Sequence, residues 1–255
     1  MRVAILGCGP SGLIAAAGVE SAGHEPVIFS RHRKSELFGA QYLHAPIPGI
    51  PAEQVDIDYR LVGSAENYRR KVYGDRDIEV SPEYLSHPHK GWDIRATYDA
   101  LWERFNGCIR DTFLNPFSTA DISRKYDVVL STVPRPILCD NGAHGFTSKA
   151  VRAMGDAPER GQAVPFSHCP PNTILCNGDL RVPYYRISNI FGFRTVEWPL
   201  SSPPADGLGA RVVKPIQHNC DCWDGANVQF LGRYGKWQKG VLSHNSFVEA
   251  RKAVA

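Results

Sequence analysis

Three glycines near the start of the chain follow the pattern GxGxxG, which is typical of sites that hold a dinucleotide. Gly7 permits a tight turn, Gly9 lets the backbone approach a pyrophosphate, and Gly12 allows a helix to pack closely on a strand. Backbone amides at the start of that helix, beside Pro10 and Ser11, would face the phosphates with help from the helix dipole. We therefore predict that these five residues contact a pyrophosphate.

The elements around these glycines form a βαβ unit. Arg2–Leu6 is a short apolar run typical of a buried parallel strand, and an alanine-rich helical pattern follows from Leu13 to Ala22. Gly23 ends that helix, and Pro26–Phe29 supplies a second strand. Because strand, glycines, helix and strand come in this order, the evidence for a dinucleotide site is much stronger than the motif alone provides.

The end of the second strand does not follow the usual pattern. An acidic residue commonly holds a ribose hydroxyl there, whereas this chain has Ser30 followed by Arg31, His32 and Arg33. Ser30 can form a hydrogen bond but carries no charge, and the arginines would suit the 2′-phosphate of NADP. Both FAD and NADPH are open at this point.

The composition indicates an ordinary soluble globular protein. The chain has 255 residues, of which 43% are hydrophobic and 22% charged, and its net charge of +3 is too small to indicate nucleic acid as the main ligand. No apolar run approaches the length of a membrane span, and no basic-then-apolar leader precedes Arg2. We expect a cytoplasmic protein that acts on a small molecule, with its oligomeric state undetermined.

The seven cysteines predict free thiols. Cys220 and Cys222 form a CxC pair near His218, and His168 precedes Cys169 elsewhere. Zinc fingers and ribbons prefer CxxC-type pairs, so this spacing is a poor match and we predict no metal site.

Further along the chain, Tyr126–Ser131 is an apolar run that predicts a buried strand, and Thr132, Val133 and Pro134 end it. Ligands of open α/β sheets bind beyond the carboxyl ends of such strands, so Thr132 and Pro134 are expected near the cofactor. Further strands are predicted at Gln54–Leu61, Cys108–Phe113, Asn172–Cys176, Arg211–Pro215 and Val228–Leu231. Helices are predicted at Ala65–Val72, at Asp93–Phe105 and from Leu242 or Ser243 to Ala253, where Ser243 is a plausible N-cap. Ser81–Trp92 is predicted to be a loop.

The stretch Arg181–Gly192 concentrates polar and aromatic side chains in a strand-like pattern. Alternation would place Tyr185 on one face and both Tyr184 and Arg186 on the other. Two interpretations fit this pattern equally well. The stretch is either a wall of the site that faces a substrate or an amphipathic edge strand. Near the end of the chain, the Phe230–Gly240 stretch predicts a strand and a basic, glycine-rich turn before a helix, which would be a second anion site.

Together these stretches resemble the glutathione-reductase-like FAD flavoproteins, in the branch that holds amine oxidases, protoporphyrinogen oxidase and UDP-galactopyranose mutase. The resemblance rests on the order of GCGPSG at Gly7–Gly12, DVVLSTVP at Asp127–Pro134 and FLGRYGKWQKG at Phe230–Gly240. In that family the last motif closes over the isoalloxazine and the pyrophosphate. The implied contacts in this chain are Gly232, Arg233, Trp237 and Gly240.

Two further stretches are similar to the mutase. Gly39–His44 resembles the segment that runs beside the flavin, with Gln41 in place of a first histidine and His44 matching a second. Pro183–Ser188, PYYRIS, resembles the strand that borders the flavin pocket. The chain departs from the family at Ser30 and in its short length, which leaves little room for a helical substrate domain.

The resemblance implies an α/β protein with a Rossmann-like FAD-binding fold and a small, reduced substrate-binding portion made of a β-sheet plus helices. We expect a single FAD-binding unit, with its core at about 1–50, 93–140 and 225–255 and the substrate portion at about 51–92 and 141–224. The implied function is an FAD-dependent oxidoreductase whose substrate faces His44, Tyr184, Tyr185 and Arg186, with His44 as general acid or base.

Three alternatives stay open at this stage. One is a mutase-like flavoenzyme that acts on a nucleotide sugar with no net redox change. Another is a non-catalytic sensor that binds FAD or NADPH, and the last is a reductase that binds NADPH through Ser30, Arg31 and Arg33.

Overall fold

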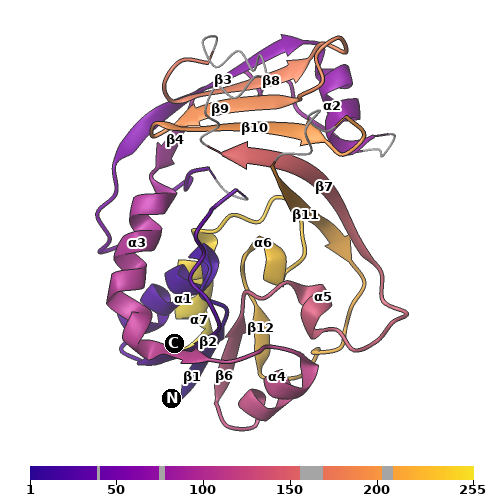
Figure 1. Cartoon of the computed structure of the whole chain (residues 1–255). Helices are drawn as coiled ribbons and strands as arrows, with labels where there is room; N and C mark the ends of the chain where they lie inside the picture. Colours follow the sequence, from indigo (N-terminus) through magenta and orange to yellow (C-terminus); the bar gives the residue numbers. More distant parts are fainter. Residues whose placement is uncertain (39–40, 75–77, 156–168, 203–208) are drawn as a thin grey trace.

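Two β-sheets divide the molecule into a parallel layer near the chain ends and a larger, mostly antiparallel layer above it in Figure 1. The computed structural model describes residues 1–38, 41–74, 78–155, 169–202 and 209–255. The first sheet has five parallel strands in the order β12-β6-β1-β2-β5. Its strands are β1 (Val3–Leu6), β2 (Pro26–Ser30), β5 (Ile109–Asp111), β6 (Val128–Ser131) and β12 (Val228–Phe230).

Helices cover both faces of the parallel sheet, which explains why β1 is an unbroken apolar run rather than an alternating one. One face packs against α1, with α3 and α7 beside it, and α4 covers the other face. The helical elements of this part are α1 (Pro10–Ser21), α3 (Ile94–Phe105), η1 (Asn106–Cys108), α4 (Pro116–Ser123), α5 (Arg135–Leu138), α6 (Gly232–Gly235) and α7 (Asn245–Ala253).

Helix α1 lies at the centre of this layer, and Gly12–Val19 are all buried. The packing on α7 is so close that a Cβ added at Gly18 would come within 2.4 Å of the carbonyl oxygen of Phe247. Small residues along α1 therefore let two segments from opposite ends of the chain touch backbone to backbone.

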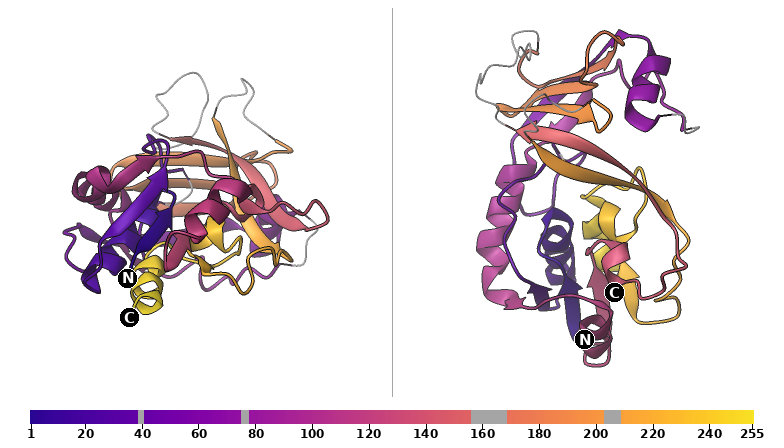
Figure 2. Two further views of the ribbon diagram at one scale, coloured as in Figure 1. Left: turned by 90° about the horizontal axis from the view of Figure 1, so that it is seen from below. Right: turned by 45° about the vertical axis from the view of Figure 1, so that its right-hand side comes forward.

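The second sheet has seven strands in the order β11-β7-β10-β9-β8-β3-β4, and all neighbours are antiparallel except β3 and β8. Its strands are β3 (Gln54–Gly63), β4 (His89–Trp92), β7 (Phe146–Gly155), β8 (Thr173–Gly178), β9 (Arg186–Ile190), β10 (Phe193–Pro199) and β11 (Ala210–His218). Helix α2 (Ala65–Tyr73) packs on this layer, and Ser64 caps its start by accepting a hydrogen bond from the amide of Asn67. Figure 2 shows the long β7–β11 ribbon running down beside α6.

The chain crosses between the two sheets four times within the described residues: after β2, after β4, after β6 and after β11. Each sheet is therefore completed by segments that are far apart in the sequence. Among the described residues, no helix combines the length and the hydrophobicity that a membrane span requires.

The structure confirms most of the predicted elements of the parallel layer and corrects three details. His89–Trp92 forms β4 instead of a loop, because it pairs with Gln54–Ile57 at the sheet edge. Ser243 is not the N-cap of α7, since that position falls on His244, which offers no side-chain cap. The expected alternation is wrong for Arg186, which reaches Glu197 together with Tyr185 instead of facing the same way as Tyr184, because β9 begins only at Arg186.

Candidate functional site

Three turns converge at the carboxyl ends of the parallel strands. Thr132, after β6, donates both its amide, at 2.9 Å, and its hydroxyl, at 3.0 Å, to the carbonyl of Leu6 at the end of β1. Gly232, after β12, lies against the first turn, since a Cβ added there would be 2.5 Å from Ser11 Oγ. The fold thus brings together Gly7–Gly12, Thr132 and Gly232, as the sequence predicts.

The glycines of the first turn have different surroundings. Gly7 has a φ of +96° and Gly12 has no room for a side chain, because its Cβ would lie 1.9 Å from the carbonyl oxygen of Gly7. Gly9 differs, since a Cβ there would meet nothing within 4 Å. The backbone at Gly9 therefore faces space that no side chain of the described residues fills.

The start of α1 is suited to an anion. Gly9 is its N-cap and supplies no side-chain cap, Pro10 occupies the first turn, and that turn carries no acidic residue. The amides of a helix start are unpaired within the helix, and the dipole favours negative charge there. A pyrophosphate would satisfy these donors next to the open side of Gly9.

The turn at α6 adds the partly buried guanidinium of Arg233 to the same region. Gly232 has a φ of +65°, and a Cβ at Gly235 would be 2.5 Å from the carbonyl of Ser131. Arg233 Nη2 donates to the carbonyl of Pro215 at 3.3 Å, while its Nε is buried without a partner among the described residues. An unpaired buried guanidinium nitrogen is costly and fits an anionic or carbonyl acceptor that binds from outside the chain.

Trp237 and Gly240 fix the path of the chain after this turn. Trp237 is buried with a φ of +47°, and its indole Nε1 donates to the carbonyl of Thr147 at 3.1 Å. Gly240 has a φ of +84°. The indole of Trp237 thus fastens the turn to the chain at the start of β7, and its contact with a cofactor stays a prediction.

The basic residues after β2 pair with the chain itself. Arg31 lies 3.9 Å from Asp111 and stacks over Phe113, and Arg33 forms an ion pair with Asp99 and stacks over Trp102. These exposed pairs are weak, but they give both guanidinium groups a role without any ligand. Ser30 ends β2 and its backbone carbonyl accepts the amide of Thr112.

A buried cluster of charged residues occupies one face of the second sheet. Arg186 and Lys214 each lie 2.5 Å from a different oxygen of Glu197, whose side chain is only 2% exposed. The hydroxyl of Tyr185 also donates to Glu197, and Lys149 Nζ lies 4.8 Å from the centre of the Tyr185 ring. We call these five residues the Glu197 cluster.

Three side chains of the Glu197 cluster have shifted pKa values. Burial alone would raise the pKa of Glu197, but the charges of Arg186 and Lys214 outweigh it and hold that pKa far below its usual range. Burial lowers the pKa of Lys214 to about 7, against the opposing effect of Glu197. Burial, followed by repulsion from Lys214, also lowers the pKa of Lys149 well below its usual value.

Of the predicted substrate-facing residues on this stretch, two belong to the cluster. Tyr185 and Arg186 both reach Glu197, but Tyr184 packs in a separate apolar group with Ile187 and Trp198. Sequence reasoning missed Glu197, Lys149 and Lys214. The signal for Lys214 was a lysine within the apolar run Val212–Ile216.

The cluster lies on the face of the sheet that receives the segment around His44. Ser188 and Thr195 are paired across β9 and β10 on the same face as Arg186 and Glu197. Gln41 Nε2 donates to both hydroxyls, at 2.6 and 2.8 Å. Gln41 therefore ties the segment that leaves the parallel layer to this face, while Gly39 and Ala40 lie outside the described residues.

His44 lies between the two layers, in ring contact with Tyr42 at 4.5 Å and 6.3 Å from the ring of His244. Burial, followed by repulsion from His244 and His89, lowers the pKa of His44 to about 4. The imidazole is therefore neutral at pH 7. This favours the role of a base or neutral hydrogen-bonding group over that of an imidazolium acid.

The shifted pKa of His44 predicts a pH-dependent loss of stability. Above about pH 6.5 the ring is neutral in both the folded and the unfolded chain. As the pH falls to about 4, only the unfolded chain takes up the proton, so wild type should lose about 1–2 kcal/mol more than His44→Gln, after allowance for partial exposure. Urea midpoints of both proteins at about pH 7.5 and 4.5 measure this difference, and equal losses would contradict it.

Comparison with known proteins identifies the fold. No family model matches the chain, and no curated protein matches it. A solved structure of reduced UDP-galactopyranose mutase superposes with a TM-score of 0.55 at 11% identity, covering 99% of this chain and 94% of the other. The flavin-dependent brominase Bmp2 gives a TM-score of 0.51 at 10% identity, covering 99% and 76%. The chain has the mixed α/β fold of FAD-binding flavoenzymes, which confirms the predicted fold class.

Proposed function

We propose that the protein binds FAD noncovalently at the carboxyl ends of the parallel strands and is an FAD-dependent oxidoreductase that acts on a small molecule. The observation that carries this proposal is the meeting of the Gly7–Gly12, Thr132 and Gly232 turns beside an uncapped start of α1. The fold supports it, because dinucleotides bind at this edge of such sheets.

The residues present fit FAD along its length. Gly9 and the first turn of α1 would hold the pyrophosphate, Gly232 and Arg233 would flank it, and the Ser30 hydroxyl would bind the ribose. Thr132 and Pro134 would border the same edge, with Gln41 and His44 towards the second sheet. When bound, FAD supplies the electron or hydride transfer of the reaction.

The Glu197 cluster would then shape the substrate side of the site. Glu197, itself paired with Arg186, holds Lys214 Nζ in place, and a lysine with a pKa of about 7 can keep or release a proton near neutral pH. Arg233 and Arg186 each keep a buried Nε without a partner among the described residues. These groups would bind negative charge on a substrate or on the reduced flavin.

A mutase-like reaction is the second candidate, because the similar mutase structure is covered over 94% of its length and His44 matches its motif. Incubation of dithionite-reduced protein with UDP-galactopyranose separates the two. Turnover of the sugar nucleotide without net oxidation supports the mutase, whereas reoxidation coupled to loss of a substrate supports the oxidoreductase. NADPH as the sole ligand is less well supported, since Arg31 and Arg33 have partners in the chain.

The absorption spectrum of purified protein tests the proposal directly. We expect a yellow protein with one FAD per chain, bleached by dithionite, or an apoprotein that binds added FAD stoichiometrically. Protein that contains no flavin and does not bind added FAD would overturn the proposal.

Gly9→Ala is expected to weaken FAD binding by at least about tenfold while leaving the apoprotein as stable as wild type. Apart from its two neighbours in the chain, no atom of the described residues lies within 4 Å of the added methyl group, so we expect the clash to be with a ligand. Gly107→Ala is the matched control, because its Cβ also meets nothing within 4 Å and it lies in η1. Flavin titration and urea denaturation of all three proteins check this. An FAD affinity of Gly9→Ala equal to that of the control would contradict the predicted position of the pyrophosphate.

A further inference from the structure

Two loops meet at the foot of the β7–β11 ribbon, where the chain passes between the two sheets. Cys139–Gly145 leads from α5 into β7, and Asn219–Cys222 follows β11. The register of the ribbon pairs Phe146 with His218 at its end. Asn219 Oδ1 then accepts the amide of Gly145 at 2.6 Å, so the two loops are held against each other.

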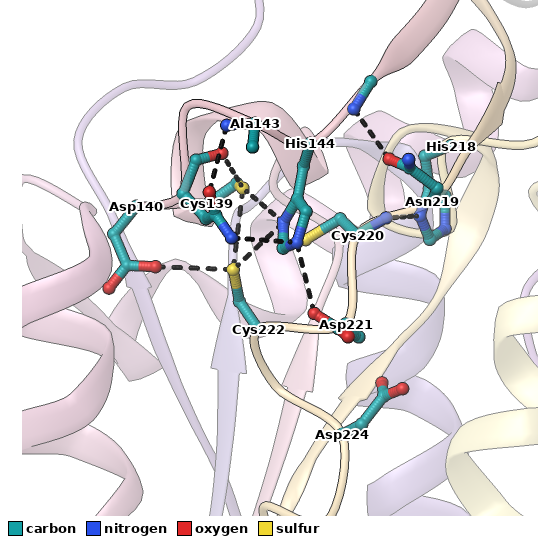
Figure 3. A network of polar contacts seen from close by, with 12 residues as sticks. Cys139, Asp140, Ala143, His144, His218, Asn219, Cys220, Asp221, Cys222 and Asp224 are labelled. Carbon is teal, nitrogen blue, oxygen red and sulfur yellow. Dashed lines mark hydrogen bonds and ion pairs between the residues drawn. The ribbon is translucent and has the colours of Figure 1, made fainter.

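The ribbon brings three thiols and one imidazole together at this point, as Figure 3 shows. The ligand atoms of Cys139, His144, Cys220 and Cys222 all lie within 4.8 Å of one another. Sγ of Cys139 and Sγ of Cys222 are 3.6 Å apart. His144 Nδ1 lies 3.3 Å from Cys139 Sγ and 3.4 Å from Cys222 Sγ.

The separations among Cys139, His144 and Cys222 are close to those of a tetrahedral zinc site, and Cys220 Sγ lies near enough to be the fourth ligand. With Zn–S bonds of about 2.3 Å and Zn–N bonds of about 2.0–2.1 Å, tetrahedral ligand atoms lie about 3.8 Å apart for two sulfurs and about 3.5–3.6 Å apart for a sulfur and a nitrogen. A disulfide would need only two of the three thiols and gives no reason for His144 Nδ1 to face the sulfurs. Three thiols and one imidazole are a donor set that Zn²⁺ prefers.

The other ring nitrogen of His144 has one partner that a zinc-bound histidine usually has, since His144 Nε2 lies 3.3 Å from Asp221 Oδ1. The amide nitrogen of Asn141 also lies 3.1 Å from Nε2, but it is itself a donor and does not accept from a protonated Nε2. A carboxylate on the far nitrogen fixes the tautomer in which Nδ1 is free to bind metal. The side chain of His144 is only 12% exposed and Cys220 is buried, so packing restrains these two ligands before any ion binds, whereas Cys139 and Cys222 are partly buried.

Three thiolates and a neutral imidazole on a divalent cation would leave one negative charge. Arg135 lies beside the cluster: its guanidinium is 10% exposed and donates to the carbonyl of Cys220 at 2.8 Å. Arg135 also lies 3.6 Å from Asp224 Oδ1, and Asp140 Oδ1 lies 3.3 Å from Cys222 Sγ, so the cation of Arg135 offsets part of the negative charge around the ion.

We propose that Cys139, His144, Cys220 and Cys222 bind one Zn²⁺ in a closed, structural site. All four positions would be filled by the protein, which leaves none for a reactive water or substrate. The ion would join the segment that enters the second sheet after β6 to the segment that returns from it before β12. Trp223 Nε1 already bonds the carbonyl of Leu138 at 2.8 Å across the same pair of segments.

Metal analysis of tag-free protein, purified without chelators, tests the site. We expect one zinc per chain in wild type, in Cys108→Ser and in His144→Cys, which keeps four ligands. Cys222→Ser and His144→Ala should lose it, and cobalt substitution of wild type should give the visible spectrum of a tetrahedral thiolate site. Zinc retained in both of these variants would overturn the assignment.

Alkylation of the native wild-type protein decides the question even if the variants fail to fold. With zinc bound, Cys139, Cys220 and Cys222 should be protected, and they should react after the metal is removed, whereas Cys108 reacts similarly in both states. Three outcomes would overturn the proposal: a disulfide between any of the three cysteines in freshly isolated protein, reaction of all three in the presence of zinc, or no uptake of added Zn²⁺ or Co²⁺ by reduced protein.

Discussion

Glu197→Ala is expected to destabilise the folded protein by about 3–5 kcal/mol, because it removes the buried carboxylate that pairs with both Arg186 and Lys214. Lys214 can respond by losing its proton, since its pKa is already lowered to about 7. Arg186 cannot, because a guanidinium stays charged at all ordinary pH values. Most of the loss therefore comes from leaving Arg186 buried and unpaired.

Urea denaturation followed by tryptophan fluorescence measures this effect. Glu66→Ala is the control, since Glu66 also pairs with two arginines but does so at the surface, and its midpoint should be close to wild type. Glu197→Gln keeps the shape but not the charge and should fall between the two. A midpoint for Glu197→Ala as high as that of Glu66→Ala would show that the cluster is not buried as described.

Gly12→Ala is expected to destabilise the protein by about 3 kcal/mol and to abolish FAD binding. Its Cβ would lie 1.9 Å from the carbonyl oxygen of Gly7 and 3.0 Å from Thr132 Oγ1, so the backbone of the first turn must move. The gain in helix propensity from glycine to alanine is only about 1 kcal/mol and cannot offset this overlap.

Gly12→Ala and Gly9→Ala together separate folding from binding. Gly12→Ala should lower both the urea midpoint and the flavin content, whereas Gly9→Ala should lower the flavin content alone. Gly107→Ala is the reference for both measurements. A Gly12→Ala protein that keeps the wild-type midpoint and binds FAD would contradict the close packing of α1 on the first turn.

The parallel layer was predictable because its signals are local. Gly7, Gly12 and the short apolar runs around them determine their own turns, and the structure confirms both strands and the helix between them. The second sheet was harder to predict. The sequence pattern predicts neither β7 nor β10. For β7 the reason is that Phe146–Gly155 includes Lys149 and Arg152 and has no simple alternation of apolar residues.

Both residue clusters depend on strand pairs that are remote in sequence. Lys149 meets Lys214 only through the β7–β11 register, and Glu197 meets Arg186 through β9–β10. The CxC spacing of Cys220 and Cys222 is wrong for a zinc ribbon, so by itself it predicts no metal site. Cys139 and His144 lie too far along the chain for any spacing rule to connect them with that pair.

The backbone contact between α1 and α7 has a consequence for synthesis of the protein. The apolar helix α1 leaves the ribosome long before Phe247, on whose carbonyl Gly18 packs. It also precedes Val254, whose carbonyl oxygen lies 3.1 Å from Nε2 of His24. At about 5–20 residues per second, more than 220 residues take roughly 10–45 s to translate, and throughout that time α1 lacks its cover. The nascent chain therefore exposes the α7-facing side of this apolar helix until α7 has been made, and the parallel layer is completed only then.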